Sequence, residues 1–348
     1  MPGDSHLNMS GAHGVLSWWT SWMSGVDSID LAEPDQAGNA LRGAVMSGLL
    51  DLPRPGKDTA ARWAVFEAIG RLDVTLVRLA EGHADALAIL TELRAEAELQ
   101  PGRIWGVWAA VPTSVQARLV DERWMLQGER PWCSGTSVCT NALVTARAAD
   151  GIGLFAVRSA GNDGVHPVPG TWPAIGMSGT DSRTISFNDA AAVRIGGTNA
   201  YTDRPGFWHG GGGVAACWYG AAFGVAEDFR AAAGDDPHQL AHLGAVDAAL
   251  AAGRAVLDAH AQAIDADPDD AFGTARRRTL QTRAVIEDVA ERILRHTGRA
   301  LGASPLCRDR RHARRVADLS IYLRQSHAES DLQALGQMTA DQTAWPWS

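Results

Sequence analysis

The sequence predicts an α+β protein in which an antiparallel β-barrel or sandwich lies between two helical parts. Three observations support this fold class. Apolar residues recur at helical spacing in the first hundred residues, short β-prone runs separated by turns fill the middle, and four long segments with apolar faces follow. We expect an N-terminal helical domain over residues 1–103, a β domain over 104–200 and a C-terminal four-helix bundle over 201–348.

The composition is that of a globular protein. The chain has 348 residues, of which 46% are apolar and 20% charged, with a net charge of −9. This negative charge argues against a nucleic-acid binder, which needs a basic face. No apolar run reaches the ~20 residues that span a bilayer, and no secretion signal opens the sequence. We therefore expect a cytoplasmic protein without a membrane span.

Metal and disulfide chemistry are not expected. His238 and His242 are four residues apart and could share a metal, but no convincing third ligand accompanies them. The cysteines lack the spacing of a zinc site and are sparse for so long a chain, so reduced thiols are expected. These cysteines are Cys133, Cys139, Cys217 and Cys307.

Lys57 is the only lysine of the chain. It lies in residues 53–59, a turn-rich loop, so an enzyme that forms a Schiff base would have to use this residue. Asp58 follows Gly56-Lys57 and no glycine stands at the required upstream position, so the sequence excludes a phosphate-binding loop of the Walker type.

Two helices are predicted in the N-terminal part, at residues 60–70 and 71–98. Thr59 is the predicted N-cap of the first. In the second, five leucines recur at helical spacing and His83 fills the gap on the same face. The Gln-Pro-Gly sequence at 100–102 then ends the helical pattern.

The β domain is predicted from short β-prone runs. Asp150-Gly151 and the Asn-Asp-Gly sequence at 162–164 mark hairpin-type turns. Because the runs are too close together to hold crossover helices, an antiparallel arrangement is favoured over a parallel sheet. The predicted strands are residues 104–111, 123–127, 142–147, 154–157 and 184–187.

Four long helices are predicted after residue 206. The glycine run at 210–213 is interpreted as a flexible entry to the first of them. Short connections and apolar faces indicate a four-helix bundle. The predicted helices are residues 214–233, 240–265, 272–298 and 312–335.

The segment from Gly128 to residue 136 offers a possible binding wall. We expect the strand at 123–127 to turn at Gly128. In an extended segment, side chains at i and i+2 share a face, so Trp132 and Ser134 could line one wall together. A flat aromatic ring beside a hydroxyl suits a planar ligand with polar edges, such as a flavin. The alternative interpretation is that Trp132 is an ordinary core residue.

The order of elements and several motifs resemble the acyl-CoA dehydrogenase family of flavoproteins. Residues 172–182 read Trp-Pro-Ala-Ile-Gly-Met-Ser-Gly-Thr-Asp-Ser and precede the strand at 184–187 and Asn188-Asp189. They are similar to the family's Gly-Met-Arg-Gly-Thr-Asp-Ser segment and its Phe-Asp-Asp strand. Residues 128–147 resemble the family's flavin wall with its flanking strands. From about residue 45 onward, the chain is identified as a divergent, short member.

The resemblance implies FAD as the cofactor. Trp132 would pack against the isoalloxazine, Ser134 would bond its edge near N5, and Cys133 lies between them. Pro112 and Thr113 stand where the family has a Thr-Glu-Pro loop that holds flavin and substrate. The resemblance also implies an acyl-CoA or other small-molecule substrate. It further implies a homodimer or homotetramer, or a hetero-oligomer with a paralogue.

Two cofactor motifs of the family are altered in this chain. Only Pro112 and nearby hydroxyls remain of the Thr-Glu-Pro loop. The arginine that serves the cofactor pyrophosphate belongs to an Arg-x-x-Phe-Gly signature. Residues 230–239 replace this signature with a shortened acidic segment, which would repel a pyrophosphate.

The family's catalytic glutamate is also missing. Its position is nearest Ser320, and Asp318 lies about 160° away around the same helix. Abstraction of an α-proton from a thioester needs a carboxylate held at the carbon atom, so Asp318 is a weak candidate for the base. Four further carboxylates stay open as candidates: Glu81, Asp247, Glu287 and Glu291.

Three functions therefore remain open. The first is a flavin-dependent oxidoreductase that dehydrogenates an acyl thioester or a related substrate with a non-standard base. The second is an inactive, possibly flavin-free, structural subunit that pairs with an active paralogue. The third is a flavin monooxygenase-like enzyme that needs no such base.

Overall fold

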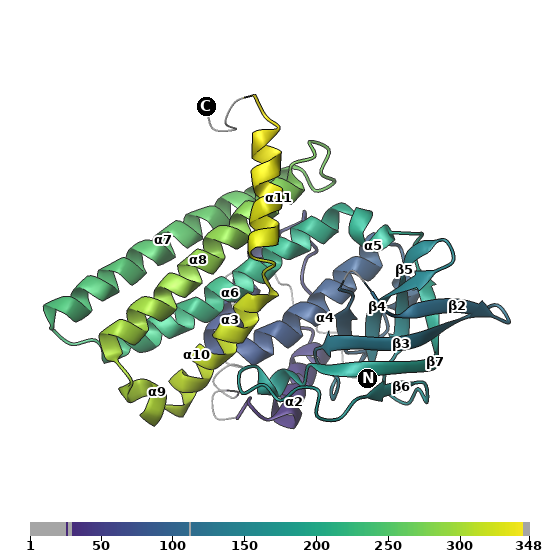
Figure 1. Ribbon diagram of the computed structural model, residues 1–348, viewed down its shortest axis with the longest axis horizontal. Helices are drawn as coiled ribbons and strands as arrows, with labels where there is room; N and C mark the ends of the chain where they lie inside the picture. Colours follow the sequence, from purple (N-terminus) through teal and green to yellow (C-terminus); the bar gives the residue numbers. More distant parts are fainter. Residues whose placement is uncertain (1–25, 27–29, 111–112, 344–348) are drawn as a thin grey trace, which may run out of the picture.

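The computed structural model describes residue 26, residues 30–110 and residues 113–343 (Figure 1). The predicted α+β class is confirmed: helices precede and follow one seven-stranded sheet. In Figure 1 the strands form one end of the molecule and the long helices fill the rest of it.

The N-terminal part contains α2 (Pro34–Met46), α3 (Thr59–Leu72), α4 (Val74–Glu92) and the short 3-10 helix η1 (Glu96–Glu98). The predicted N-cap of α3 is wrong by one residue, because the side chain of Asp58 accepts the N–H of Ala61 at 3.0 Å. The Thr59 hydroxyl instead donates to Asp265 at 2.6 Å and ties α3 to the C-terminal helices. The helix predicted at 71–98 corresponds to α4, which begins at Val74 and ends at Glu92.

The sheet consists of β1 (Trp105–Trp108), β2 (Gln116–Val120), β3 (Arg123–Cys133), β4 (Asn141–Ala148), β5 (Gly151–Arg158), β6 (Val165–Pro167) and β7 (Arg183–Ile195). Pairing runs from β4 through β2, β3, β7 and β5 back to β4, which closes a small barrel. The prediction of a purely antiparallel sheet is wrong. The strand expected at 104–111 stops at Trp108, and the chain resumes as β2 in the same direction, so β1 and β2 both pair with β4 in parallel.

Gly128 lies inside β3 and makes no turn there. β3 pairs with β7 on both sides of it, and a register shift between Leu126 and Gly128 marks a bulge. The backbone of Gly128 has φ 115°, and a Cβ added there would lie 3.2 Å from the carbonyl oxygen of Ser114. Glycine fits this conformation, so the strand continues to Cys133.

The C-terminal part contains α5 (Ala200–Asp203), α6 (Pro205–Ala232), α7 (Pro237–Ala266), α8 (Ala275–Leu301), α9 (Ser304–Arg308), α10 (Arg310–Tyr322), η3 (Leu323–Gln325) and α11 (Glu329–Ala340). The fourth predicted helix is therefore interrupted. Ala328 has φ 44°, and its N–H bonds the Ser326 hydroxyl at 3.1 Å, which ends the helical pattern before α11. In Figure 1, α11 stands at a steep angle to α6, α7 and α8. It contacts α8, where Arg277 donates to the carbonyl oxygen of Met338 at 2.6 Å.

The glycine run at 210–213 lies inside α6 and is not a loop. A Cβ at Gly211 would lie 2.9 Å from Thr279 of α8, and a Cβ at Gly212 would lie 2.9 Å from Trp63 of α3. The glycines therefore allow α6 to pack closely against both helices.

One helix of the described part, α7, is long and apolar enough by length and composition alone to cross a bilayer. It packs along α8 and α6 and buries Val246, Leu257 and Ile264 there. Only 22% of its most apolar stretch is buried within the described structure.

Arg130 occupies the interior of the barrel near the end of β3. Its guanidinium is buried and donates to the carbonyl oxygens of Ala110 at 2.6 Å and Thr145 at 2.8 Å. It also donates to the hydroxyls of Thr113 at 2.5 Å and Thr145 at 2.8 Å. One side chain thus holds three separate segments of the barrel together.

Replacement of Arg130 with methionine tests this connection. The change leaves buried carbonyls and hydroxyls without a donor, so we expect the free energy of unfolding to fall by about 3 kcal/mol. Arg118→Met is the matched control, since Arg118 makes an exposed pair with Asp189 in the same sheet. Denaturant titration should show a change of about 0.5 kcal/mol or less for the control. Equal losses in the two variants would contradict the role of Arg130.

Candidate functional site

Trp132 is a solvent-facing aromatic residue in a rare backbone conformation. Its side chain is 73% exposed, so it is not a core tryptophan. The residue has φ 58°, in the left-handed region, so the extended geometry expected at this position is wrong. Pro131 directly before it is exposed as well, whereas Arg130 and Cys133 on either side of this pair are buried. Strain of this kind costs about 1–3 kcal/mol and is concentrated at functional sites.

Ser134 follows at the end of the same segment, and its hydroxyl is positioned by other hydroxyls. Ser134 Oγ lies 2.8 Å from Ser182 Oγ, which in turn lies 2.8 Å from Thr180 Oγ1. The indole N–H of Trp108 donates to the Ser134 carbonyl oxygen at 2.9 Å. Ser182 belongs to the motif at 172–182, but sequence reasoning gave it no role, because its contact with Ser134 joins residues distant in the chain.

The other predicted cofactor residues lie inside the barrel or outside the described part. Cys133 is buried, with its thiol 3.3 Å from the Arg130 carbonyl oxygen, and burial raises the pKa of this thiol. Thr113 accepts from Arg130 and donates to the Thr145 carbonyl oxygen at 2.9 Å. Pro112 lies outside the described residues. Cys133 and Thr113 are therefore buried residues of the barrel.

Asp318 connects α10 to the motif at 172–182. Its carboxylate is buried and accepts the N–H of Met177 at 2.5 Å, with Arg314 Nε 3.9 Å away. Burial raises the pKa of Asp318 to about 6. Ser320 lies on an exposed face of the helix, where its hydroxyl donates to the Val316 carbonyl oxygen at 2.7 Å. Asp318 therefore joins α10 to the loop that contains Met177.

Of the four open carboxylates, Glu81 on α4 is the buried one. Its side chain is 5% exposed and pairs with Arg78 at 2.6 Å. Asp85, one turn further along α4, pairs with Arg62 at 2.6 Å. Burial, aided by the nearby Asp85 carboxylate, raises the pKa of Glu81 to about 8, so Glu81 keeps its proton near neutral pH.

The remaining candidates lie in more open surroundings. Asp247 is exposed on α7. Glu291 pairs with Arg324 at 2.5 Å on the surface, and Glu287 lies 3.6 Å from the same arginine. Only Glu81, among these four, combines burial with a second carboxyl group.

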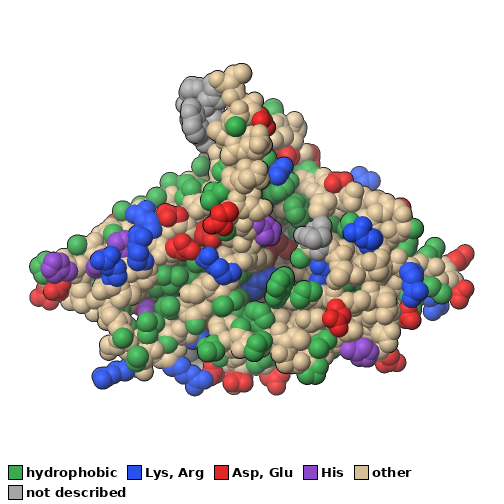
Figure 2. All heavy atoms as spheres, viewed as in Figure 1, with side chains coloured by type: hydrophobic (Ala, Val, Ile, Leu, Met, Phe, Trp, Pro, Cys, Tyr) green, Lys and Arg blue, Asp and Glu red, His purple; other side chains and the backbone are tan. Residues whose placement is uncertain are grey.

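The segment that contains Trp132 and Ser134, called the Trp132–Ser134 wall below, lies next to α4. A Cβ added at Gly135 would lie 3.3 Å from Leu79 of α4. The sulfur of Cys139 is 3.9 Å from the Ser134 carbonyl oxygen. Burial raises the pKa of this thiol, and the positive charge of Arg78 on α4 partly opposes that rise. Figure 2 shows a hollow between the strands and the helices, below α11, with acidic and basic side chains at its floor.

No group of three His, Cys, Asp or Glu side chains that could hold a metal ion occurs within residues 30–110 and 113–343. Nδ1 of His242 lies 2.9 Å from Nδ1 of His296 on α8. His238, the other member of the predicted pair, is exposed.

No protein-family model and no curated protein matches the sequence. Similar solved structures include TdsC from Paenibacillus sp. A11-2 with FMN and indole, at TM-score 0.80 and 18% identity, covering 96% of this chain and 98% of that one. KijD3 with FMN and a dTDP-linked keto sugar has TM-score 0.81 and 15% identity, covering 96% and 94%. Methanesulfinate monooxygenase MsuC from Pseudomonas fluorescens has TM-score 0.77 and 18% identity, covering 97% and 98%.

These likenesses establish the acyl-CoA dehydrogenase-like fold for this chain. Because the chain spans nearly the whole of each neighbour, the expectation of a short member is not supported.

The proton that Glu81 keeps near neutral pH makes stability depend on pH. Between pH 4.5 and about 8, Glu81 keeps its proton in the folded state and loses it in the unfolded state, so stability falls as pH rises. We expect a loss of up to about 1.4 kcal/mol per pH unit between pH 6.5 and 8. Buried His83 and His260, whose pKa values are lowered to about 4 and about 3, are neutral throughout this window.

Glu81→Gln should flatten this decline, because the amide cannot ionise. Glu291→Gln is the control, since it removes an exposed carboxylate. Urea titrations at pH 6.5 and pH 8 compare the three proteins. If wild type and Glu81→Gln decline in parallel, the retained proton on Glu81 is disproved.

Proposed function

We propose that this chain is a flavin-dependent oxidoreductase that binds FMN on the Trp132–Ser134 wall and oxygenates a small molecule. The observation that carries the proposal is the exposed indole of Trp132, held in a left-handed backbone conformation between two buried residues. Such a ring offers a stacking face to an isoalloxazine. The adjoining Ser134 hydroxyl offers a hydrogen bond to the ring's edge, and its partner Ser182 orients it.

FMN fits the chain better than the FAD that the sequence resemblance implies. FMN carries one phosphate, so it does not need the arginine that serves a pyrophosphate. In the segment that replaces this arginine motif, Asp236 caps α7 by accepting from His238 at 2.8 Å and Gln239 at 3.0 Å. TdsC and KijD3 were both solved with FMN, which supports the same choice.

Oxygenation fits the chain better than dehydrogenation of an acyl thioester. Dehydrogenation needs a carboxylate at the α-carbon. Ser320 occupies the expected position, and Asp318 is engaged by the Met177 N–H. MsuC is a monooxygenase, as is HsaA from M. tuberculosis, another similar structure at TM-score 0.71. Reduced flavin, when bound, supplies the electrons that place one atom of dioxygen in the substrate and release the other as water.

The protein's own side chains would divide the remaining tasks. Trp132 would bind one face of the ring, Ser134 would orient its edge, and Glu81 of α4 would hold a proton close by. A carboxyl group that keeps its proton near neutral pH suits the proton transfers that formation of water requires. The substrate in this proposal is a small molecule, as indole is for the TdsC complex.

Flavin uptake tests the proposal directly. Quenching of FMN fluorescence on addition of protein should give saturable binding. Trp132→Ala should weaken it at least tenfold, about 1.4 kcal/mol, because the stacking surface is lost. Phe272→Ala is the matched control, since it removes another exposed aromatic ring, from the connection between α7 and α8. Absence of FMN uptake by wild type, or unchanged uptake by Trp132→Ala, contradicts the proposal.

An experiment on the flavin-loaded protein distinguishes oxygenation from dehydrogenation of an acyl thioester. Under anaerobic conditions, acyl-CoA thioesters of several lengths should leave the absorbance of oxidised flavin unchanged. Bleaching of this band by an acyl-CoA would favour dehydrogenation instead.

A further inference from the structure

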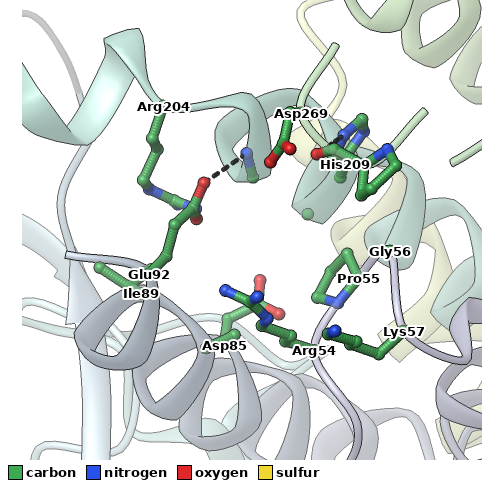
Figure 3. A pocket seen from close by; sticks show the side chains of 14 residues that line it. Arg54, Pro55, Gly56, Lys57, Asp85, Ile89, Glu92, Arg204, His209 and Asp269 are labelled. Carbon is green, nitrogen blue, oxygen red and sulfur yellow. Dashed lines mark hydrogen bonds and ion pairs between the residues drawn. The ribbon is translucent and has the colours of Figure 1, made fainter. Parts of the chain in front are cut away.

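A second cavity lies on another part of α4. It is formed by the loop that contains Arg54 and Lys57, by α4, by the first turns of α6 and by the connection between α7 and α8 (Figure 3). Its volume is about 190 Å³. An engineered cavity of about 150 Å³ in another protein holds benzene, so this one admits a molecule slightly larger than a benzene ring.

Two of the acidic side chains in this cavity are already neutralised. Glu92 pairs with Arg204 at 2.7 Å and also accepts the N–H of Gly206 at 3.0 Å. Asp85 pairs with Arg62 at 2.6 Å. These carboxylates therefore add no net negative charge to the cavity.

Arg54 and Lys57 contribute positive charge that is not neutralised. Both are exposed, and neither has an ion-pair partner among the residues that the structure describes. Figure 3 shows them on one side of the cavity, across from Glu92 and His209. Burial lowers the pKa of His209, so the ring is neutral at pH 7. Asp269 supplies one negative charge, which leaves an excess of one positive charge.

The rest of the lining is suited to an apolar body. Ala88 and Ile89 of α4 line one side, and Pro55 and Pro268 line the loops. Gly56 approaches Pro268 so closely that an added Cβ would lie 2.4 Å from its side chain, and φ at Gly56 is 84°. The loop that carries both cations is thereby held against the α7–α8 connection.

We propose that this cavity binds a small organic monoanion. Its carboxylate is held by Arg54 and Lys57, and its apolar body lies against Ile89 and Pro268. One excess positive charge matches one carboxylate, and the volume matches an aromatic or short branched acid. Neither Trp132 nor Ser134 lines this cavity, although Asp85 of α4 does, and binding there does not depend on a flavin.

The single lysine allows a selective measurement. Reductive methylation with ¹³C-formaldehyde labels only Lys57 and the N-terminal amine and keeps their positive charge. The ¹³C NMR signal of Lys57 should then shift saturably as benzoate is added. The N-terminal signal reports non-specific effects of the salt. Benzamide, which has the same shape without the charge, should leave the Lys57 signal in place.

Variants of exposed residues test which groups hold the anion. Arg54→Gln should weaken benzoate binding at least fivefold, and Asp269→Asn should strengthen it, because the first removes a positive charge and the second a negative one. Arg42→Gln on the exposed face of α2 is the matched control and should bind as wild type does. The proposal is overturned if benzoate leaves the Lys57 signal unshifted, if benzamide shifts it equally, or if inorganic phosphate binds more tightly than benzoate.

Discussion

The buried guanidinium of Arg130 is the contact on which the proposed site depends. It sits two residues before Trp132 and donates to acceptors from Ala110, Thr113 and Thr145. A charge in the interior is tolerated only where such acceptors satisfy it. These bonds fix the end of β3 and leave little freedom for the residues that follow. The left-handed backbone of Trp132 is therefore held by the barrel itself.

The segment from Trp132 to Gly135 also contacts parts of the chain far away in sequence. Ser182 of the motif at 172–182 hydrogen-bonds the Ser134 hydroxyl. Asp318 of α10 accepts the N–H of Met177 in the same motif. On the other side, α4 carries Glu81 and Asp85 and reaches the wall through Leu79. Barrel, N-terminal helices and C-terminal helices therefore meet at one place.

Local signals in the sequence predicted the helices and strands better than the pairing and packing between them. Helical spacing of leucines located α4, and the turn at Asp150-Gly151 separates β4 from β5. The prediction of a flexible entry at residues 210–213 is wrong because only the nearness of Trp63 and Thr279 explains glycine inside α6. The prediction of a turn at Gly128 is wrong because the bulge depends on β7, which follows some sixty residues later. The parallel pairs of β4 depend equally on distant partners.

In the candidate site, too, local signals predict single residues but not their contacts with distant parts of the chain. Trp132 and Ser134 can be identified from the segment that contains them, whereas the contact of Ser182 and the raised pKa of Glu81 follow only from three-dimensional neighbours.

The most direct test is a crystal structure of the protein grown with FMN. We predict the isoalloxazine stacked on the indole of Trp132, with N5 within hydrogen-bonding distance of the Ser134 hydroxyl. A flavin bound elsewhere, with Trp132 still facing solvent, would contradict this account.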